Sequence, residues 1–159
     1  SENPRSSLWR IRNVSLSHPL NSIRSDVYKN AIALFVSEVL YRTVREGMES
    51  ESLFDWCCKS VLELDALQSD FCNFHLLFLL GLTSRLGFEA SVEDLAPFVG
   101  ENLGVVKELV SLPAAGALLL PMSGRTRNDI AQSLILYLSR HTETAINVQS
   151  LKVLSEVLR

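Results

Sequence analysis

The sequence predicts an all-α fold, a multi-helix bundle preceded by a single short β-strand. After residue 20, apolar residues recur at the three- and four-residue spacing of helices, and Ser, Asp and Gly stand where helices start and stop. Before residue 20, one stretch alternates with the period of two that is typical of a strand. Hydrophobic residues make up 47% of the 159 residues, which is enough for one domain with a buried core.

The predicted strand covers residues 8–15, where Trp9 and Ile11 alternate with Arg10 and Arg12. No second strand lies nearby in the sequence, and a lone strand cannot satisfy its backbone donors and acceptors. We therefore expect it to pair with a segment outside the chain, to pair with a second copy in a dimer, or to unravel.

The first helix is expected to begin at Ser25, a favourable N-cap, and to end at Gly47. Asp26 lies in its first turn, where the helix dipole favours a negative charge. Between residues 31 and 41 the only charge is Glu38. Because apolar residues cover more than half of its circumference, we expect this helix to lie in the middle of the bundle.

Further helices follow along the chain. Ser50 caps the second helix, and a third helix over 70–86 places Phe71, Phe74 and Phe78 on one face. The remaining predicted segments are a short helix from the Ser91–Asp94 capping box to 97–100, a helix over 103–112, a loop or short helix over 113–121, a long helix over 123–141 and a short helix over 151–158.

The composition limits the classes of function. A net charge of −3 argues against bulk attraction to nucleic-acid phosphates, so any such contact needs a local basic patch. We expect no secretory leader, because the first ten residues hold no apolar run after a basic start, and the uncharged apolar segment 71–84 is shorter than the roughly 20 residues that span a bilayer. The three cysteines are an odd number and suit free thiols in a reducing cytoplasm. We therefore expect a cytoplasmic protein without a membrane contact.

No catalytic or metal-binding motif stands out. Cys57 and Cys58 are adjacent, so on a helix they point about 100° apart and cannot hold one ion. We expect at least one of them, together with Cys72, to pack in the core. His75 lies in an apolar helix without a carboxylate three or four residues away, which favours a core histidine over a catalytic base.

Glu38 is the unusual charge of the first helix. A buried carboxylate needs a partner, and Arg42, four residues later, is the local candidate. We expect a structural ion pair rather than a catalytic acid, because no second titratable group is set beside it.

Three blocks of the sequence resemble the C-terminal part of the bacterial recombination mediator RecO. They cover nearly the whole chain in the same order: His18-Pro19 with the apolar helix 31–45; Leu53-Phe54-Asp55-Trp56 with 73–80 and Leu86-Gly87-Phe88; and Ser123 to Asn128 with 150–154. The resemblance implies that residues 1–20 are the last strand and linker of a truncated OB-fold. It implies that residues 21–159 are the helical domain.

The resemblance also implies a function. RecO-like proteins are non-catalytic adaptors that bind single-stranded DNA-binding protein and RecR, anneal complementary strands and help to load RecA. Their helical domain is implied to bind the tail of single-stranded DNA-binding protein, an acidic peptide that ends in apolar residues. We expect the DNA contact to lie mainly in the missing OB-fold. Many RecO proteins hold zinc with four cysteines, but residues 88–123 contain no Cys or His, so we expect no zinc and no other cofactor.

An acidic, apolar tail requires an apolar pocket with Arg or Lys at its mouth. Candidate residues for binding the partner or nucleic acid are Arg10, Arg12, Arg24, Lys29, Arg42, Arg45, Arg85, Arg125 and Arg127. Candidate residues for the apolar pocket are Leu53, Phe54, Trp56, Leu82, Leu86 and Phe88.

Two other classes of function are compatible with a helical bundle. The chain could be a protein-interaction scaffold unrelated to recombination, which an upstream OB-fold pattern would argue against. An enzyme, such as a small hydrolase, would need paired titratable groups that the sequence does not offer.

Overall fold

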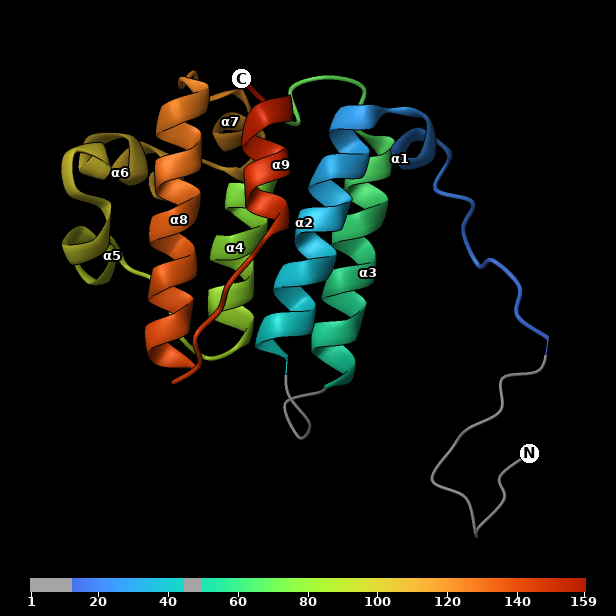
Figure 1. The fold of residues 1–159 in the computed structure, drawn as a ribbon, viewed down its shortest axis with the longest axis horizontal. Helices are drawn as coiled ribbons and strands as arrows, with labels where there is room; N and C mark the ends of the chain where they lie inside the picture. Colours follow the sequence, from blue (N-terminus) through green and yellow to red (C-terminus); the bar gives the residue numbers. More distant parts are fainter. Residues whose placement is uncertain (1–12, 45–49) are drawn as a thin grey trace, which may run out of the picture.

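The structure is a computed structural model that describes residues 13–44 and 50–159. Within these residues it contains nine α-helices, one short 3₁₀ helix and no strand (Figure 1). The helices are α1 Asn21–Ser25, α2 Val27–Thr43, α3 Glu51–Ala66, α4 Phe74–Arg85, α5 Val92–Val99, η1 Gly100–Asn102, α6 Leu103–Ser111, α7 Ala114–Leu119, α8 Gly124–His141 and α9 Ser150–Val157.

The all-α prediction is confirmed, but the preceding strand is not supported. Residues 8–12 of the predicted strand lie outside the described residues, and residues 13–16 form no strand. Asn13 has a φ of 62°, in the left-handed region that a strand does not use. Since no partner strand exists among the described residues, the described end of this segment has no ladder to join.

Two helix starts differ from the prediction. The N-cap of α2 is Asp26, whose carboxylate accepts from the backbone N–H groups of Tyr28 at 2.8 Å and Lys29 at 3.1 Å, while Ser25 ends the unpredicted helix α1. Helix α4 begins at Phe74 rather than at residue 70, because Asp70 has a φ of 58°. The predicted stop at Gly47 lies outside the described residues.

The helices form a bundle with α4 near its centre. Figure 1 shows α2 and α3 on one side, α8 with α5 and α6 on the other, and α4 and α9 between them. Every residue of α4 from Phe74 to Thr83 is buried or half-buried. Helix α2 is less central than predicted, because its side chains Val27, Leu34 and Tyr41 are exposed. Within the described ranges, no helix combines the length and apolar character needed to cross a membrane.

Gly81 allows α3 to pack tightly on α4. A Cβ at this position would lie 2.6 Å from Cζ2 of Trp56, and the indole is stacked on Phe78 with ring centroids 4.8 Å apart. Gly81→Ala should therefore lower the free energy of unfolding by about 1–3 kcal/mol through overpacking.

Urea unfolding followed by circular dichroism checks this prediction. The matched control is Gly104→Ala in α6, where an added Cβ would meet open space. We expect this control to raise the free energy of unfolding by about 0.5–1 kcal/mol, because alanine is the better helix former. Equal effects at the two positions would contradict the tight contact at Gly81.

Candidate functional site

An apolar groove of about 760 Å³ lies beside α2 and α3. We call it the α2–α3 groove. Its walls are formed by Leu40 on α2 and Val44 directly after α2, by one face of α3, and by Ser17, His18 and Leu20 before α1. Phe54 is 67% exposed and Leu62 36% exposed, so part of the groove's apolar surface faces solvent. An open apolar surface of this kind is typical of a docking site.

The structure places two of the six predicted pocket residues on this groove, Leu53 and Phe54. Leu82 is fully buried in the core, so the prediction that it lines a pocket is wrong. Trp56 packs on Phe78. Leu86 and Phe88 are half-buried against the core and do not line the α2–α3 groove. The predicted apolar set is therefore not one pocket.

The predicted basic residues are also dispersed. Arg10, Arg12 and Arg45 lie outside the described residues. Arg24, Arg42, Arg85 and Arg125 are exposed on different helices. The side chains of Lys29 and Arg127 form hydrogen bonds inside the protein. The prediction that they contact a partner at the surface therefore needs correction.

Lys29 is buried, with 2% of its surface exposed. Its ammonium donates to Ser22 Oγ at 2.7 Å, to the Asp65 carbonyl at 3.0 Å and to the Leu67 carbonyl. Burying a charge is tolerated only when its hydrogen bonds are satisfied. Here the lysine closes the C-terminal end of α3, whose last carbonyls lack helical partners, so its role is structural.

Arg127 belongs to a second internal network. Its Nε donates to Asn73 Oδ1 at 2.9 Å, and its terminal nitrogens donate to the carbonyls of Leu158 and Met122 at 3.1 and 3.3 Å. Burial lowers the pKa of Arg127. The network joins α8 to the start of α4 and the end of α9, which explains why this arginine is not free for a partner.

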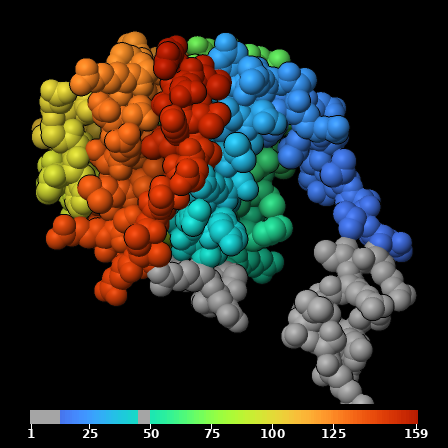
Figure 2. Space-filling view, viewed as in Figure 1, coloured from blue at the N-terminus to red at the C-terminus, as the bar shows by residue number. Residues whose placement is uncertain are grey.

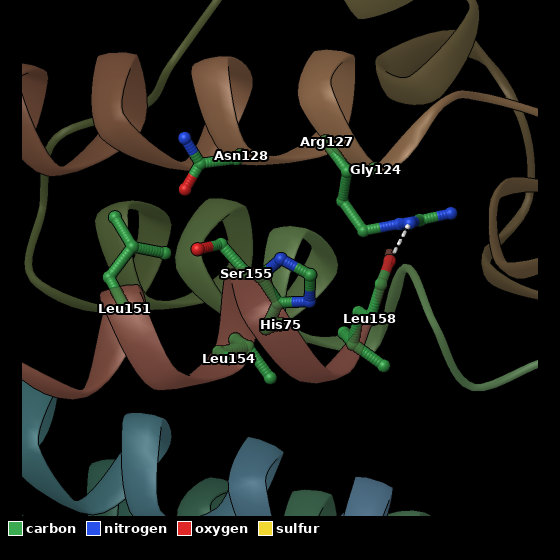
Figure 3. A pocket seen from close by; sticks show the side chains of 8 residues that line it. All are labelled: His75, Gly124, Arg127, Asn128, Leu151, Leu154, Ser155 and Leu158. Atoms are coloured by element: carbon green, nitrogen blue, oxygen red, sulfur yellow. Dashed lines mark hydrogen bonds between the residues drawn. The ribbon is translucent and has the colours of Figure 1, made fainter.

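His75 lies beside this network in a cavity of about 10 Å³, the size of one water molecule (Figure 3). Burial, reinforced by the charge of Arg127, lowers the pKa of His75 to about 3, so the ring is neutral near pH 7. Its ring stands edge-on to Phe35, with centroids 5.6 Å apart. The Ser155 hydroxyl of the same cavity donates to the Lys152 carbonyl. The prediction of a core histidine is confirmed.

Glu38 does more than the predicted ion pair. Arg42 lies 3.7 Å from its carboxylate, as expected. The same carboxylate also accepts from the backbone N–H groups of Gln149 at 3.0 Å and Ser150 at 2.8 Å, and from the Ser150 hydroxyl at 2.6 Å. Desolvation alone would raise its pKa, but these hydrogen bonds and Arg42 lower the pKa of Glu38 below its usual value. Glu38 therefore caps α9 from a helix more than a hundred residues earlier.

The capped segment borders a second groove, which the sequence did not predict. This α8–α9 groove has a volume of about 270 Å³, and it is lined by Gln132, Ile135, Leu136, Ser139, Ile146, Asn147, Val148 and Leu151. Leu136 is 57% exposed. Figure 1 shows the segment between α8 and α9 crossing the bundle obliquely, and Figure 2 shows α8, α9 and α2 side by side on this face.

The charges around the two grooves differ. Arg140 lies one helical turn after Leu136 on α8, Lys152 follows Leu151, and both are exposed. Glu38, paired with Arg42, brings a carboxylate to the nearby start of α9. The α2–α3 groove instead has the carboxylate of Asp55 in its lining. The lining of the α8–α9 groove contains no charged side chain, and its nearest basic residues in the sequence come from two different helices.

Two of the three cysteine thiols lie at the α2–α3 groove. Cys57 and Cys58 both line it, with Cys57 half-buried and Cys58 exposed. Burial, together with the neighbouring Cys58, raises the pKa of Cys57. Cys72 is exposed, so the prediction of a core thiol is wrong: it lies in the turn before α4, not in the helix. No cluster of three metal-ligating side chains occurs among the described residues.

These observations define a helical bundle with two apolar grooves at its surface. Comparison with known proteins shows which family this chain resembles. Residues 24–96 match the family described as Recombination protein O C terminal. The DNA repair protein RecO of Bacteroides fragilis is 43% identical over 91 residues, which is 57% of this chain and 38% of the relative.

Two further relatives extend the match along the chain. The RecO protein of Christiangramia forsetii is 31% identical over 155 residues, 86% of this chain and 64% of the relative. That of Flavobacterium psychrophilum is 27% identical over 171 residues, 96% of this chain and 71% of the relative. The predicted resemblance to RecO is thus confirmed. The chain spans about two fifths of the length of the Bacteroides relative, and no solved structure gives a significant match.

Proposed function

We propose that this chain is the helical adaptor domain of a RecO-like mediator of DNA repair and homologous recombination in the cytoplasm. It turns over no substrate. It binds single-stranded DNA-binding protein and RecR, and in this way helps strand annealing and RecA loading, while an OB-fold makes most of the DNA contact. The similarity to DNA repair proteins RecO along the chain supports this proposal. It also makes a scaffold unrelated to recombination the weaker alternative.

We assign the tail of single-stranded DNA-binding protein to the α8–α9 groove. The observation that carries this assignment is the combination of an apolar floor with basic neighbours. Leu136 and Val148 offer apolar contacts at the surface. Exposed Arg140 lies one helical turn after Leu136, and exposed Lys152 follows the groove residue Leu151. An acidic peptide with an apolar end is complementary to both features.

The backbone beside the groove offers a further contact. Residues 145–148 have no regular secondary structure. Ile146 donates its N–H to Ser139 Oγ at 3.0 Å, whereas the N–H groups of Ala145, Asn147 and Val148 have no partner among the described residues. An extended peptide laid along this segment could pair with those groups, as in recognition by β-strand addition.

Titration of a fluorescent tail peptide against three proteins tests the assignment. Leu136→Asp should weaken binding by tenfold or more, on the order of a hot-spot loss, because it places a negative charge where the apolar end docks. The matched control is Phe54→Asp, a similarly exposed apolar position on the α2–α3 groove (67% against 57% for Leu136), which should leave the affinity unchanged.

The possible outcomes distinguish a wrong choice of groove from a wrong choice of partner. Loss of binding with Phe54→Asp but not with Leu136→Asp would overturn the choice of groove and favour the predicted pocket at Leu53 and Phe54. No binding by the folded, unsubstituted protein at high micromolar concentrations would overturn the proposed partner. Binding at the α8–α9 groove should also weaken with added salt, because Arg140 and Lys152 are exposed.

A further inference from the structure

His75 carries a buried polar atom that the protein itself does not satisfy. The side chain is 2% exposed, and among the described residues its Nδ1 is the one buried side-chain nitrogen or oxygen without a hydrogen-bond partner. The Cys72 carbonyl favours the protonated ring, but it does not meet the geometry of a hydrogen bond to Nδ1. Buried polar atoms in folded proteins almost always have a partner, either a protein group or an ordered water. A partner for Nδ1 must therefore come from outside the chain.

The cavity beside His75 has the size and the polar walls that such a partner needs. Its volume of about 10 Å³ fits one water molecule. Besides Arg127, one polar side chain from each of three helices lines it: His75 on α4, Asn128 on α8 and Ser155 on α9. Figure 3 shows the Ser155 hydroxyl and the Asn128 amide on the same side of the imidazole ring. Three helices therefore present hydrogen-bonding groups to one small volume.

These groups can satisfy a water molecule as both donor and acceptor. Ser155 directs its hydroxyl proton to the Lys152 carbonyl at 2.8 Å, so lone pairs of its Oγ stay available to accept. A neutral imidazole and a side-chain amide each offer donors and acceptors. Arg127 already donates to protein acceptors from all three of its nitrogens. An internal water needs two to four polar partners, and His75, Asn128 and Ser155 supply three.

We propose that this cavity binds one internal water molecule, hydrogen-bonded to His75 Nδ1, Ser155 Oγ and the Asn128 amide. The water joins α4, α8 and α9 at a point where no direct side-chain contact satisfies the histidine. Leu151 lines both this cavity and the α8–α9 groove. The water therefore lies behind the wall of that groove and helps to hold α9 in the position that forms it. The water site is independent of the partner that the groove binds.

A high-resolution crystal structure of the whole chain tests the site. One solvent peak should lie about 2.7–3.2 Å from both His75 Nδ1 and Ser155 Oγ. His75→Phe should lose this peak, because the phenyl ring fills the same place without a nitrogen. The matched control is His141→Phe, an exposed histidine whose Nδ1 already contacts the Tyr137 carbonyl, which should keep the peak. The parent protein alone decides the question if His75→Phe does not fold.

Nuclear magnetic resonance provides a second measurement in solution. A water held in the cavity should give a nuclear Overhauser effect between the water resonance and the Hε1 proton of His75. The effect should persist in Ser155→Ala, which removes a hydroxyl proton that exchanges with solvent and could mimic the signal. Loss of the effect in Ser155→Ala, or a crystal structure in which Nδ1 binds the Cys72 carbonyl instead of a solvent peak, would overturn the water site. Bromide density in place of the peak after a bromide soak would also overturn it and would assign the cavity to an anion.

Discussion

Asn73→Ala should lower the free energy of unfolding by about 3 kcal/mol, because it breaks a buried polar network on both sides. Asn73 is 1% exposed. Its Nδ2 donates to the carbonyls of Ala117, Leu118 and Leu120 at 3.1, 3.2 and 2.8 Å, and its Oδ1 accepts from Arg127. Alanine would leave carbonyls of the α7 turn and a guanidinium nitrogen without partners in a dry environment.

Urea unfolding monitored by tryptophan fluorescence gives the value. Asn30→Ala is the matched control, since Asn30 is exposed on α2, and such surface changes usually stay within about 0.5 kcal/mol. If Asn73→Ala lost no more stability than Asn30→Ala, the network would not be what holds the α7 turn on the bundle.

Glu38→Gln should lower the free energy of unfolding by about 1.5 kcal/mol at pH 7, because hydrogen bonds to a charged acceptor are stronger than those to a neutral amide. The carboxylate accepts three hydrogen bonds from Gln149 and Ser150. It is 18% exposed, so water compensates for part of the loss. The substitution should also disturb the wall of the α8–α9 groove, which the capped segment builds.

The pH dependence of this effect has a defined sign. Folding lowers the pKa of Glu38 below its usual value near 4.5. The stabilisation by the ionised carboxylate is therefore complete above that usual value and is lost as pH falls through the lower, folded-state pKa. The difference between the parent protein and Glu38→Gln should shrink on acidification. Glu63→Gln, which removes only an exposed pair with Lys59, should show a difference near zero at every pH; a pH-independent Glu38 effect would contradict the cap.

Local signals predicted much of the helical layout. Ser50 and Ser123 accept from the backbone of the third residue after them, and Ser91 and Asp94 form the predicted capping box. These signals act within a few residues and can be identified directly in the sequence. The misplaced starts have a local cause too: Asp26 competes with Ser25 as a cap, and a left-handed Asp70 delays α4.

Contacts between distant segments could not be predicted in this way. Glu38 caps α9 across a separation of 111 residues, and Lys29 satisfies carbonyls 36 and 38 residues away. Their sequence neighbours contain no sign of these partners. A charged residue in an apolar helix signals that a partner must exist, but only the packing of the helices shows which one.

The two grooves also differ in how far the sequence could predict them. Leu53 and Phe54 follow one another on one helix, and the structure places both on the α2–α3 groove; that this groove binds a partner stays a prediction. The α8–α9 groove combines a helix face with residues 146–148, and its basic neighbours come from separate helices. No local pattern marks such a surface. The central claim is that this surface, and not a catalytic centre, is where the domain works.

Nuclear magnetic resonance with the isotope-labelled protein tests that claim most directly. On addition of the acidic tail peptide, the account predicts saturable shifts of the backbone amides of residues 145–148, together with Leu136 and Leu151. The amides of α5 and α6 should not move. A folded protein whose amides stay unchanged at saturating peptide, or whose shifts cluster away from α8 and α9, would contradict it.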